Sequence, residues 1–275
     1  MKKIITLIVT VILSIGCIFG LTACGNDNKI TIYTESGFAP FEYVKDNKIV
    51  GVDVDIMELV GKKLKMEIEF KNVNFNTIVD AVSEGKLCDV GAAGLSVTEA
   101  RKEKVVFSTE YYTAKLYVIY PVAQETEYVS MTTDNVEGIY WDALAGKKIA
   151  VQNGTTADLF LGDELADGGS IYNTGADKVG FELLSAALNS EEKDVLIIDE
   201  LPAQMLIAGN SKYSCKPLYY QGSDGEDDEV ACDTYAIAVC PNAPAKILNA
   251  INEVIAELGE TGIQELVNKH LGLTA

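Results

Sequence analysis

Histidine is almost missing from this sequence of 275 residues, and its scarcity limits the available chemistry. The one histidine, His270, has no serine or cysteine near it in a nucleophile context. The motifs G-x-S-x-G, H-E-x-x-H and G-x-x-x-x-G-K-[ST] are absent as well. We therefore predict no enzymatic activity and no cofactor, although a mechanism based on two carboxylates stays open in a chain so rich in acids. His270 lies near the end of the last predicted helix, where a positive charge is favourable.

Basic residues are also in short supply. The chain has 22 lysines and arginines against 41 aspartates and glutamates, which gives a formal net charge of −19. Such a surface repels nucleic acid, so we expect no nucleic-acid partner. Solubility is a sufficient reason for the acidity.

The cysteines are not arranged for metal binding. Cys88, Cys215, Cys232 and Cys240 follow the N-terminal region, and none belongs to a C-x-x-C or Cys/His cluster, so no zinc site is predicted. A disulfide between Cys215 and Cys232 and a set of buried free thiols are both open interpretations. The acidic stretch 222–229 lacks the spacing of a calcium loop, which favours a solvated loop over a metal site.

The N-terminal residues predict export. Lys2 and Lys3 precede an almost wholly apolar stretch over residues 4–21, and Leu-Thr-Ala-Cys24 and a polar run follow. A basic start, an apolar stretch and a small residue before a cleavage site form a secretory signal. Leu-Thr-Ala-Cys resembles the bacterial lipoprotein signal, in which the cysteine is lipidated and becomes the mature N-terminus. We expect a signal peptide over residues 1–23, a lipidated linker over residues 24–28 and an extracytoplasmic protein held at the membrane by lipid. An uncleaved transmembrane anchor is the alternative.

The remaining ~250 residues leave room for two ordinary domains, and their pattern alternates between strands and helices. The predicted strands cover residues 29–35, 67–73, 89–94, 114–120, 147–151, 194–198 and 234–239. The predicted helices cover residues 54–65, 75–84, 96–104, 154–164, 178–188, 201–208, 245–258 and 261–269. This alternation predicts an α/β protein with mostly parallel sheets covered on both faces. The polar stretch 124–140 is interpreted as a surface excursion.

The segment from Asp89 to Arg101 carries the strongest functional signal. Asp89-Val-Gly-Ala-Ala-Gly94 is a strand of small residues, which a ligand can approach closely. Ser96 follows in a turn, where its hydroxyl and its N–H can both donate, and Thr98 opens a helix that carries Arg101. Backbone donors at a helix start together with an arginine suit a carboxylate. Taken alone, Arg101 would be interpreted as one partner of a surface ion pair.

This segment resembles the amino-acid-binding family of solute-binding proteins that serve ABC transporters. In that family a Gly-hydrophobic-Ser/Thr-hydrophobic-Thr-x-x-Arg run precedes an apolar-Phe-Ser sequence and a Tyr-Tyr entry to a hinge. The resemblance covers nearly all of the chain after the N-terminal region. Its further matches are Phe38-Ala-Pro-Phe-Glu-Tyr43, Gly51-Val-Asp-Val-Asp-Ile56, Asn74-Phe75, the run from Gly146 to Thr155, and Asp194-Val-Leu-Ile-Ile-Asp199. The sequence departs from the family at Thr109-Glu110, where Asp-Pro is usual.

The resemblance implies a periplasmic-binding-protein-like fold of type II. Two lobes, each a mostly parallel sheet flanked by helices, would close on the ligand about a hinge of two strands. The first lobe would span residues 29–115 and 234–275, and the second lobe would span residues 116–233. We expect a monomer that delivers its ligand to the permease subunits of an ABC importer.

The resemblance also implies how the head group of a free amino acid is held. Arg101 would bind the α-carboxylate through two parallel hydrogen bonds, assisted by Ser96 and by the N–H groups near Thr155 and Thr156. The acceptors for the α-ammonium would be Asp199, the Gly94 carbonyl and Ser96.

The ligand's side chain is the least determined part of the expectation. Phe38 and Phe75 would sandwich it, with core packing as their alternative role, and Glu35 and Gln152 would face its far end. An acid at Glu35 favours a polar or cationic side chain. A sensor domain for an amino acid or small carboxylate and a dehydratase on the same fold are the alternative functions.

Overall fold

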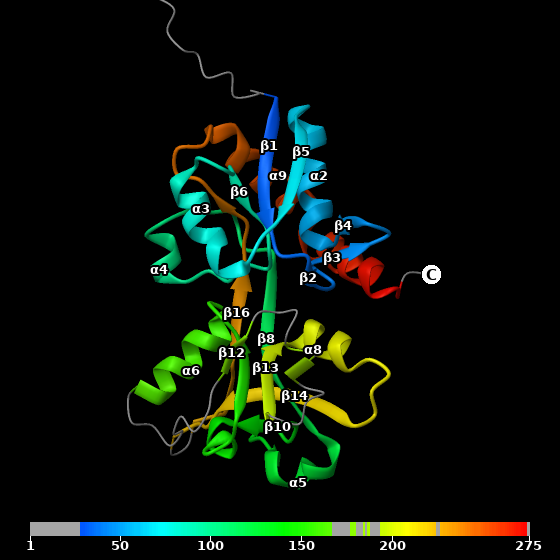
Figure 1. Ribbon diagram of the computed structural model, residues 1–275, viewed down its shortest axis with the longest axis vertical. Coiled ribbons are helices and arrows are strands. Elements are labelled where there is room, and N and C mark those ends of the chain that lie inside the picture. The colour runs from blue at the N-terminus through cyan, green and yellow to red at the C-terminus, as the bar shows by residue number, and fades with distance from the viewer. Residues whose placement is uncertain are drawn as a thin grey trace, which may run out of the picture.

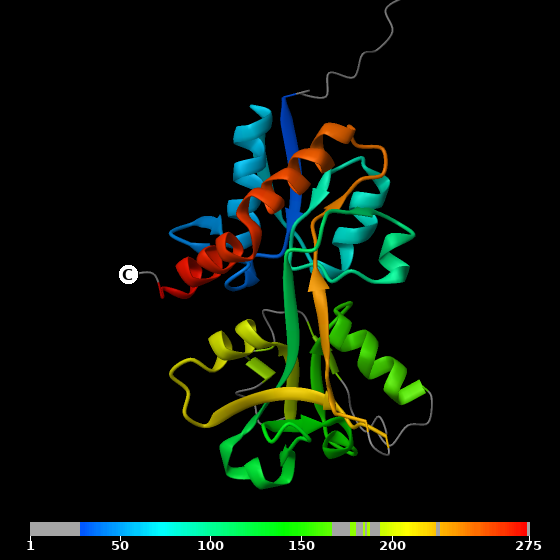
Figure 2. The same ribbon diagram turned by 180° about the vertical axis from the view of Figure 1, so that it is seen from behind.

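The computed structural model describes residues 28–166, 177–179, 184, 186–187, 193–223 and 226–273. The predicted signal peptide and the lipidation site at Cys24 lie outside the described residues. The described chain forms two lobes stacked along the long axis of the molecule (Figure 1). Strands β8 (Tyr112–Pro121) and β16 (Cys232–Tyr235) run between the lobes (Figure 2).

The first lobe is built on a five-stranded sheet in the order β5-β1-β6-β17-β7. Strand β1 pairs in parallel with β5 and β6, and β17 pairs antiparallel with β6 and β7. The strands are β1 (Lys29–Thr34), β5 (Glu67–Asn72), β6 (Val90–Gly91), β7 (Val106–Phe107) and β17 (Ala238–Val239), and a separate small sheet holds β2 (Gly37–Phe38), β3 (Glu42–Lys45) and β4 (Lys48–Val50). The helices are α2 (Val52–Leu64), η1 (Phe75–Thr77), α3 (Ile78–Glu84), α4 (Glu99–Lys102) and α9 (Ala245–Leu271).

Local sequence explains the long elements of this lobe. In β1 every second side chain is buried, as the alternation Lys-Ile-Thr-Ile-Tyr-Thr requires for a strand with one covered face. Helix α2 carries Asp53 and Asp55 in its first turn and lysines in its last turn, which suits the helix dipole. It ends at Lys65, which adopts a left-handed conformation and donates its N–H to carbonyls of the last turn.

The second lobe is built on a nine-stranded sheet. Its main path runs β12-β11-β13-β8-β14-β10-β9, with β15 beside β14 and β16 beside β8. The strands are β9 (Val129–Met131), β10 (Glu137–Tyr140), β11 (Ile149–Gln152), β12 (Asp177–Val179), β13 (Val195–Asp199), β14 (Tyr213–Tyr220) and β15 (Glu229–Val230). The helices are η2 (Val122–Gln124), α5 (Glu125–Tyr128), η3 (Trp141–Leu144), α6 (Thr156–Ala166) and α8 (Glu200–Ile207).

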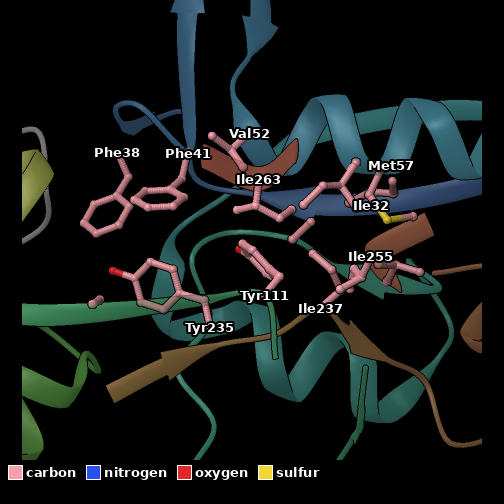
Figure 3. Close-up of a cluster of buried hydrophobic side chains, with 14 of the residues drawn as sticks. Ile32, Phe38, Phe41, Val52, Met57, Tyr111, Tyr235, Ile237, Ile255 and Ile263 are labelled. Atoms are coloured by element: carbon pink, nitrogen blue, oxygen red, sulfur yellow. The ribbon is translucent and has the colours of Figure 1, made fainter. Parts of the chain in front are cut away.

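An aromatic cluster fills the first lobe where it meets the hinge strands. Phe41 and Tyr235 are fully buried, and their rings meet edge to face with centroids 5.0 Å apart. Phe38 lies beside Phe41 and Tyr111 lies beside Tyr235 in the same buried cluster (Figure 3). The hydrophobic burial of large rings at this point fixes strand β16 against the first lobe.

The fold class is confirmed, with several corrections in detail. The sheets mix parallel and antiparallel pairs, because β8 pairs antiparallel with β13, β14 and β16, and β17 pairs antiparallel with β6. The helix predicted over residues 178–188 is wrong at its start, where β12 instead pairs with β11; most of its remaining residues lie outside the described part. The stretch 124–140 is more than an excursion, since β9 and β10 extend the sheet. The two predicted C-terminal helices are confirmed, because Gly259 interrupts α9 with a non-helical backbone (φ +57°) between them. The predicted strand 234–239 is instead two short strands, β16 and β17.

The cysteines, His270 and the two phenylalanines of the first loop have definite places in the fold. All four cysteines in the described residues are free, with Cys88 and Cys240 buried. The His270 ring lies in the last turn of α9, and its Nε2 lies 2.9 Å from Asp55 Oδ2 of α2. Phe38 and Phe41 both belong to the buried core cluster, with Phe38 8% exposed and Phe41 fully buried.

Alanine substitution at two glycines, one closely packed and one in open space, tests the packing of the first lobe around Phe41. A Cβ on Gly51, whose φ is +148°, would lie 1.9 Å from the backbone oxygen of Phe41, whereas one on Gly162 in α6 would meet nothing within 4 Å. We expect Gly51→Ala to lower the free energy of unfolding by about 3 kcal/mol. Gly162→Ala should raise it by about 0.5–1 kcal/mol, because alanine favours the helix. Urea denaturation of both variants measures this, and equal effects would contradict the packing described.

Candidate functional site

The carboxyl ends of parallel strands from both lobes face the same cleft. Strand β1 leads into Glu35 and β6 leads toward Gly94 in the first lobe, while β11 ends at Gln152 and β13 ends at Asp199 in the second. Loops at such strand ends are where α/β sheets commonly bind ligands. The topology of each sheet therefore brings these side chains together, although they are far apart in sequence.

A narrow cavity lies between the lobes at this point. Nine of the ten residues predicted to bind a ligand line it, together with Ala93; the nine are Glu35, Phe38, Phe75, Gly94, Ser96, Gln152, Thr155, Thr156 and Asp199. Its free volume is about 10 Å³, which is the room of one water molecule. A solute must therefore part contacts between the two walls in order to enter.

Arg101, the tenth predicted residue, is a buried bridge between the lobes. Its guanidinium donates to the Ser96 carbonyl at 2.6 Å in its own lobe and to the Gly154 carbonyl at 2.9 Å in the other. It also lies over the ring of Phe75, 5.5 Å from the centroid. The side chain is only 8% exposed, so the alternative of a surface ion pair is wrong. Burial lowers the pKa of Arg101, and the nearby charge of Asp233 opposes that shift.

Two further contacts join the walls of the cavity. Gln152 donates through Nε2 to Glu35 Oε2, so the two residues predicted to face the end of a ligand side chain meet each other. Ser96 Oγ and Thr156 Oγ1 lie 3.4 Å apart and share a hydrogen bond. These hydrogen bonds join the wall of the second lobe to that of the first, and a polar ligand can replace them.

The start of helix α6 supplies backbone donors to the cavity. The Thr155 hydroxyl donates to the Gln152 carbonyl at 2.9 Å and accepts from the N–H of Asp158 at 3.3 Å. The Gly154 N–H donates to the Asp158 carboxylate at 2.9 Å. These local bonds fix the turn that presents Thr155 and Thr156, and the first N–H groups of a helix are suited to an anion.

Asp199 is a buried acid at the end of β13. Burial is the main reason that its pKa is raised well above the usual range, and the charge of Asp233 adds to the effect. Its Oδ1 makes no hydrogen bond with the described residues. A nearby cation would stabilise the charged form of this buried carboxylate, because burying an unpaired charge is costly.

Sequence analysis missed Asp233 and Tyr235, which lie beside Asp199. Both belong to β16, in the stretch expected to cross between the lobes. Side chains two residues apart in a strand point to the same face. Tyr235 is fully buried and Asp233 is its neighbour on the same face, so the two-residue periodicity of the strand is a signal that could have placed this acid beside the cleft.

A second set of missed residues supports Gly94 from behind. Asp53 accepts from the Gly94 N–H at 2.9 Å and from the Tyr111 hydroxyl. Gly94 has a φ of +52°, and a Cβ there would lie 3.0 Å from the Phe38 ring. Burial raises the pKa of Asp53 to about 6, although these two hydrogen bonds favour its charged form. Glu42 is fully buried nearby, and its pKa is raised well above the usual range by burial and by Asp53.

Other parts of the described structure offer weaker sites. A hollow of about 700 Å³ lies in the second lobe, lined by Pro121, Lys193, Asp194, Lys212 and Tyr213 among others. Within the described residues, no group of three or more histidine, cysteine, aspartate or glutamate side chains is placed to hold a metal ion. No helix of this part is long and apolar enough to cross a membrane.

Two lobes joined by a pair of strands, with a polar cavity between them, define a class of proteins that capture small solutes by closing around them. A family model described as bacterial extracellular solute-binding proteins, family 3, matches residues 30–273. The chain belongs to this family. It is a solute-binding protein and not an enzyme, as are the relatives that it matches.

The relatives carry the following descriptions. The arginine-binding extracellular protein ArtP of Bacillus subtilis is 26% identical over 282 residues, which cover 98% of this chain and 97% of the relative. A probable histidine-binding protein of Campylobacter jejuni is 25% identical, covering 87% and 83%. Among solved structures, the amino-acid ABC-transporter substrate-binding protein AbpA of Streptococcus pneumoniae bound to L-arginine has a TM-score of 0.72 at 25% identity, covering 90% and 96%. An ancestral arginine-binding protein bound to arginine has a TM-score of 0.71 at 26% identity, covering 89% and 99%.

The raised pKa of Asp53 predicts how stability depends on pH. An acid whose pKa is raised by folding stabilises the fold below its unfolded pKa of about 3.9, and this contribution is lost as the pH rises through about 6. The difference corresponds to about 3 kcal/mol. We expect Asp53→Asn, which keeps an acceptor for Gly94, to flatten the fall in stability between pH 4 and 7.

Urea denaturation across this pH range measures the effect. Asp46→Asn is the matched control, because Asp46 lies in an exposed turn with a positive φ that asparagine tolerates. Equal pH slopes in the wild type and Asp53→Asn would contradict the assignment.

Proposed function

We propose that this chain binds a free amino acid with a cationic side chain between its lobes and delivers it to an ABC importer. The observation that carries the proposal is the pairing of a buried arginine, Arg101, with a buried acid, Asp199, around one interlobe cavity. An α-amino acid has one anionic and one cationic group on the same carbon. Relatives described as arginine-binding and histidine-binding support the same class of ligand.

The carboxylate would bind between Arg101 and the start of α6. A guanidinium has five N–H donors, so Arg101 can keep its bond to the Ser96 carbonyl and still offer two parallel donors to a carboxylate. The bond from Arg101 to the Gly154 carbonyl would give way to the ligand. The Ser96 hydroxyl and the N–H groups of Thr155 and Thr156 complete the set of donors.

The ammonium would bind at Asp199, with the Gly94 carbonyl and the Ser96 hydroxyl as further acceptors. Asp53 holds the Gly94 peptide through its N–H, so that its carbonyl is presented in a fixed direction. A site that buries both charges excludes solutes lacking either group, because the unmatched protein charge would stay unpaired.

The acidic wall at Glu35 favours a cationic side chain. Glu35 and Gln152 lie together on opposite walls, and Phe38 and Phe75 line the space beside them. Guanidinium groups stack well on aromatic faces, as Arg101 does on Phe75. A guanidinium or ammonium would replace Gln152 as the partner of Glu35.

The location follows from the N-terminal sequence. We propose that the chain is exported, cleaved before Cys24 and held at the outer face of the membrane by lipid on this cysteine. The lobes would comprise residues 29–115 with 234–275, and residues 116–233, and would act as a monomer. In this arrangement β8 and β16 form the hinge.

A thermal-shift screen of the twenty amino acids tests the proposed ligand class. At a hundredfold excess over Kd, binding adds about 2.7 kcal/mol of stability, and we expect L-arginine and similar cations to raise Tm by several degrees. Arg101→Ala should abolish the shift, and Asp199→Asn should reduce it. Lys102→Ala, on the exposed side of the same helix, is the control and should respond like the wild type. The proposal is rejected if no amino acid shifts the wild type, or if Arg101→Ala still responds.

A second experiment tests the side-chain preference separately. We expect Glu35→Gln to weaken L-arginine about tenfold in Kd while changing L-glutamine by much less, because only the cation loses a charged partner. Isothermal titration calorimetry gives both constants, and Glu58→Gln on the exposed side of α2 is the control. An equal loss for the two ligands would remove Glu35 from the side-chain subsite.

A further inference from the structure

Several polar atoms beside the cleft are buried without a well-formed partner. Both carboxylate oxygens of Asp233, the Oδ1 of Asp199 and the hydroxyl of Tyr235 make no hydrogen bond of good geometry with the described residues. Ser96 and Thr156 lie close enough to Asp233, and Tyr235 close enough to Asp199, to lower the pKa values of the two acids against the effect of burial. The Tyr235 side chain is fully buried. Buried polar groups without partners are uncommon, and their convergence at one place indicates a ligand.

The backbone of the hinge strand holds Asp233 beside Ser96 and Thr156, which line the cavity. In β16, Asp233 stands opposite Ala114 and Tyr235 opposite Tyr112 of β8. Backbone hydrogen bonds join the segment 95–97 to β16: Val97 donates its N–H to the Thr234 carbonyl at 2.9 Å, and Ala236 donates its N–H to the Leu95 carbonyl at 3.1 Å. Ser96 lies between these two bonds, so its hydroxyl is held close to the Asp233 side chain.

Electrostatics show that Asp233 and Asp199 act on each other. The charge of Asp233 helps to raise the pKa of Asp199, and the pKa of Asp233 is raised mainly by burial. Two neighbouring buried carboxylates cannot both be charged unless a cation lies between them. Arg101 favours the charged form of Asp233, but its guanidinium donates to two carbonyl groups and forms no ion pair with either acid among the described residues.

Among the described residues, the other groups around the pair do not include a cation. Those that face Asp199 or Asp233 from the packed elements are the acids Glu35 and Glu42, the phenols Tyr112 and Tyr235, the thiol Cys232, and the hydroxyls Ser96 and Thr156. The site is thus rich in acceptors and negative charge. An ammonium, which has three donors and a positive charge, matches it.

We propose that Asp233 is a second carboxylate of the ammonium subsite, so that the ligand's α-ammonium lies between Asp199 and Asp233. The inference rests on the proposed binding of an amino acid and deepens it. The hinge strand then contributes directly to recognition, and closing of the lobes brings the ligand's nitrogen against both carboxylates.

The proposal has a consequence for pH dependence. Before binding, the pair retains a shared proton at a pH where isolated aspartates have lost theirs, because the two charges repel and both are buried. The ammonium displaces this proton when it binds. Affinity therefore rises with pH until the pair has lost its proton, and each binding event releases protons to the solution.

Calorimetry with matched ligands tests the assignment. The probes are L-arginine and its desamino analogue δ-guanidinovalerate, and L-glutamine with its desamino analogue glutaramate. We expect Asp233→Asn to weaken each amino acid about tenfold or more, as loss of a charged hydrogen-bond partner does. The desamino analogues should change little or bind better. Titration of the wild type in buffers of different ionisation enthalpy should show proton release, and the variant should show less.

The outcomes separate this inference from the proposed function. Equal or tighter binding of the amino acids by Asp233→Asn, or a matching loss for the desamino analogues, would overturn the inference and make Asp233 a counter-ion of Arg101. If neither amino acid binds the wild type, the proposed function fails and the inference fails with it. Asp233→Ser gives a second variant if the amide does not fold, and Asp46→Asn in the exposed turn is the control for a lost surface charge.

Discussion

The buried guanidinium of Arg101 is the group around which the cleft is arranged. A charged group taken out of water must be surrounded by acceptors, and Arg101 finds them in the Ser96 carbonyl of one lobe and the Gly154 carbonyl of the other. The same side chain therefore determines the shape of the turn after β6 and the approach of the second lobe. Exchange of the Gly154 carbonyl for a ligand carboxylate replaces a neutral acceptor by a charged one, which is the stronger interaction.

The opposite side of the cleft is dominated by acids. Asp199, Asp233 and Glu42 all have raised pKa values because burial disfavours their charges. A single arginine beside several acids gives a site that is polar at one end and negative over the rest. The proposed cationic amino acid, with one carboxylate and more than one positive charge, would suit this distribution, which is held in place by the aromatic core of Phe41 and Tyr235.

Local sequence was enough for most elements. In β1 and α2 the spacing of apolar residues in the sequence matches the residues that are buried, so both elements were predicted within a few residues. The segment 178–188 was assigned wrongly at its start, because its apolar residues fit both a helix and an edge strand, and only the pairing of β12 with β11 decides between them. Ser96 and Arg101 were identified because they stand in one short run. Asp233 was not, since its partners lie 34 residues away at Asp199 and on the other side of the hinge at Ser96.

The sequence by itself determined the α/β class, the family and nine of the ten residues that line the cavity, with Arg101 bordering it. These features are encoded in short motifs, whose residues can be matched one by one to those of a known family. Only the tertiary structure decided that Arg101 is a buried bridge, that Glu35 and Gln152 meet, and that two hinge-side carboxylates share one place. Such facts depend on burial and on the distance between charges, and both quantities arise when the two lobes approach each other.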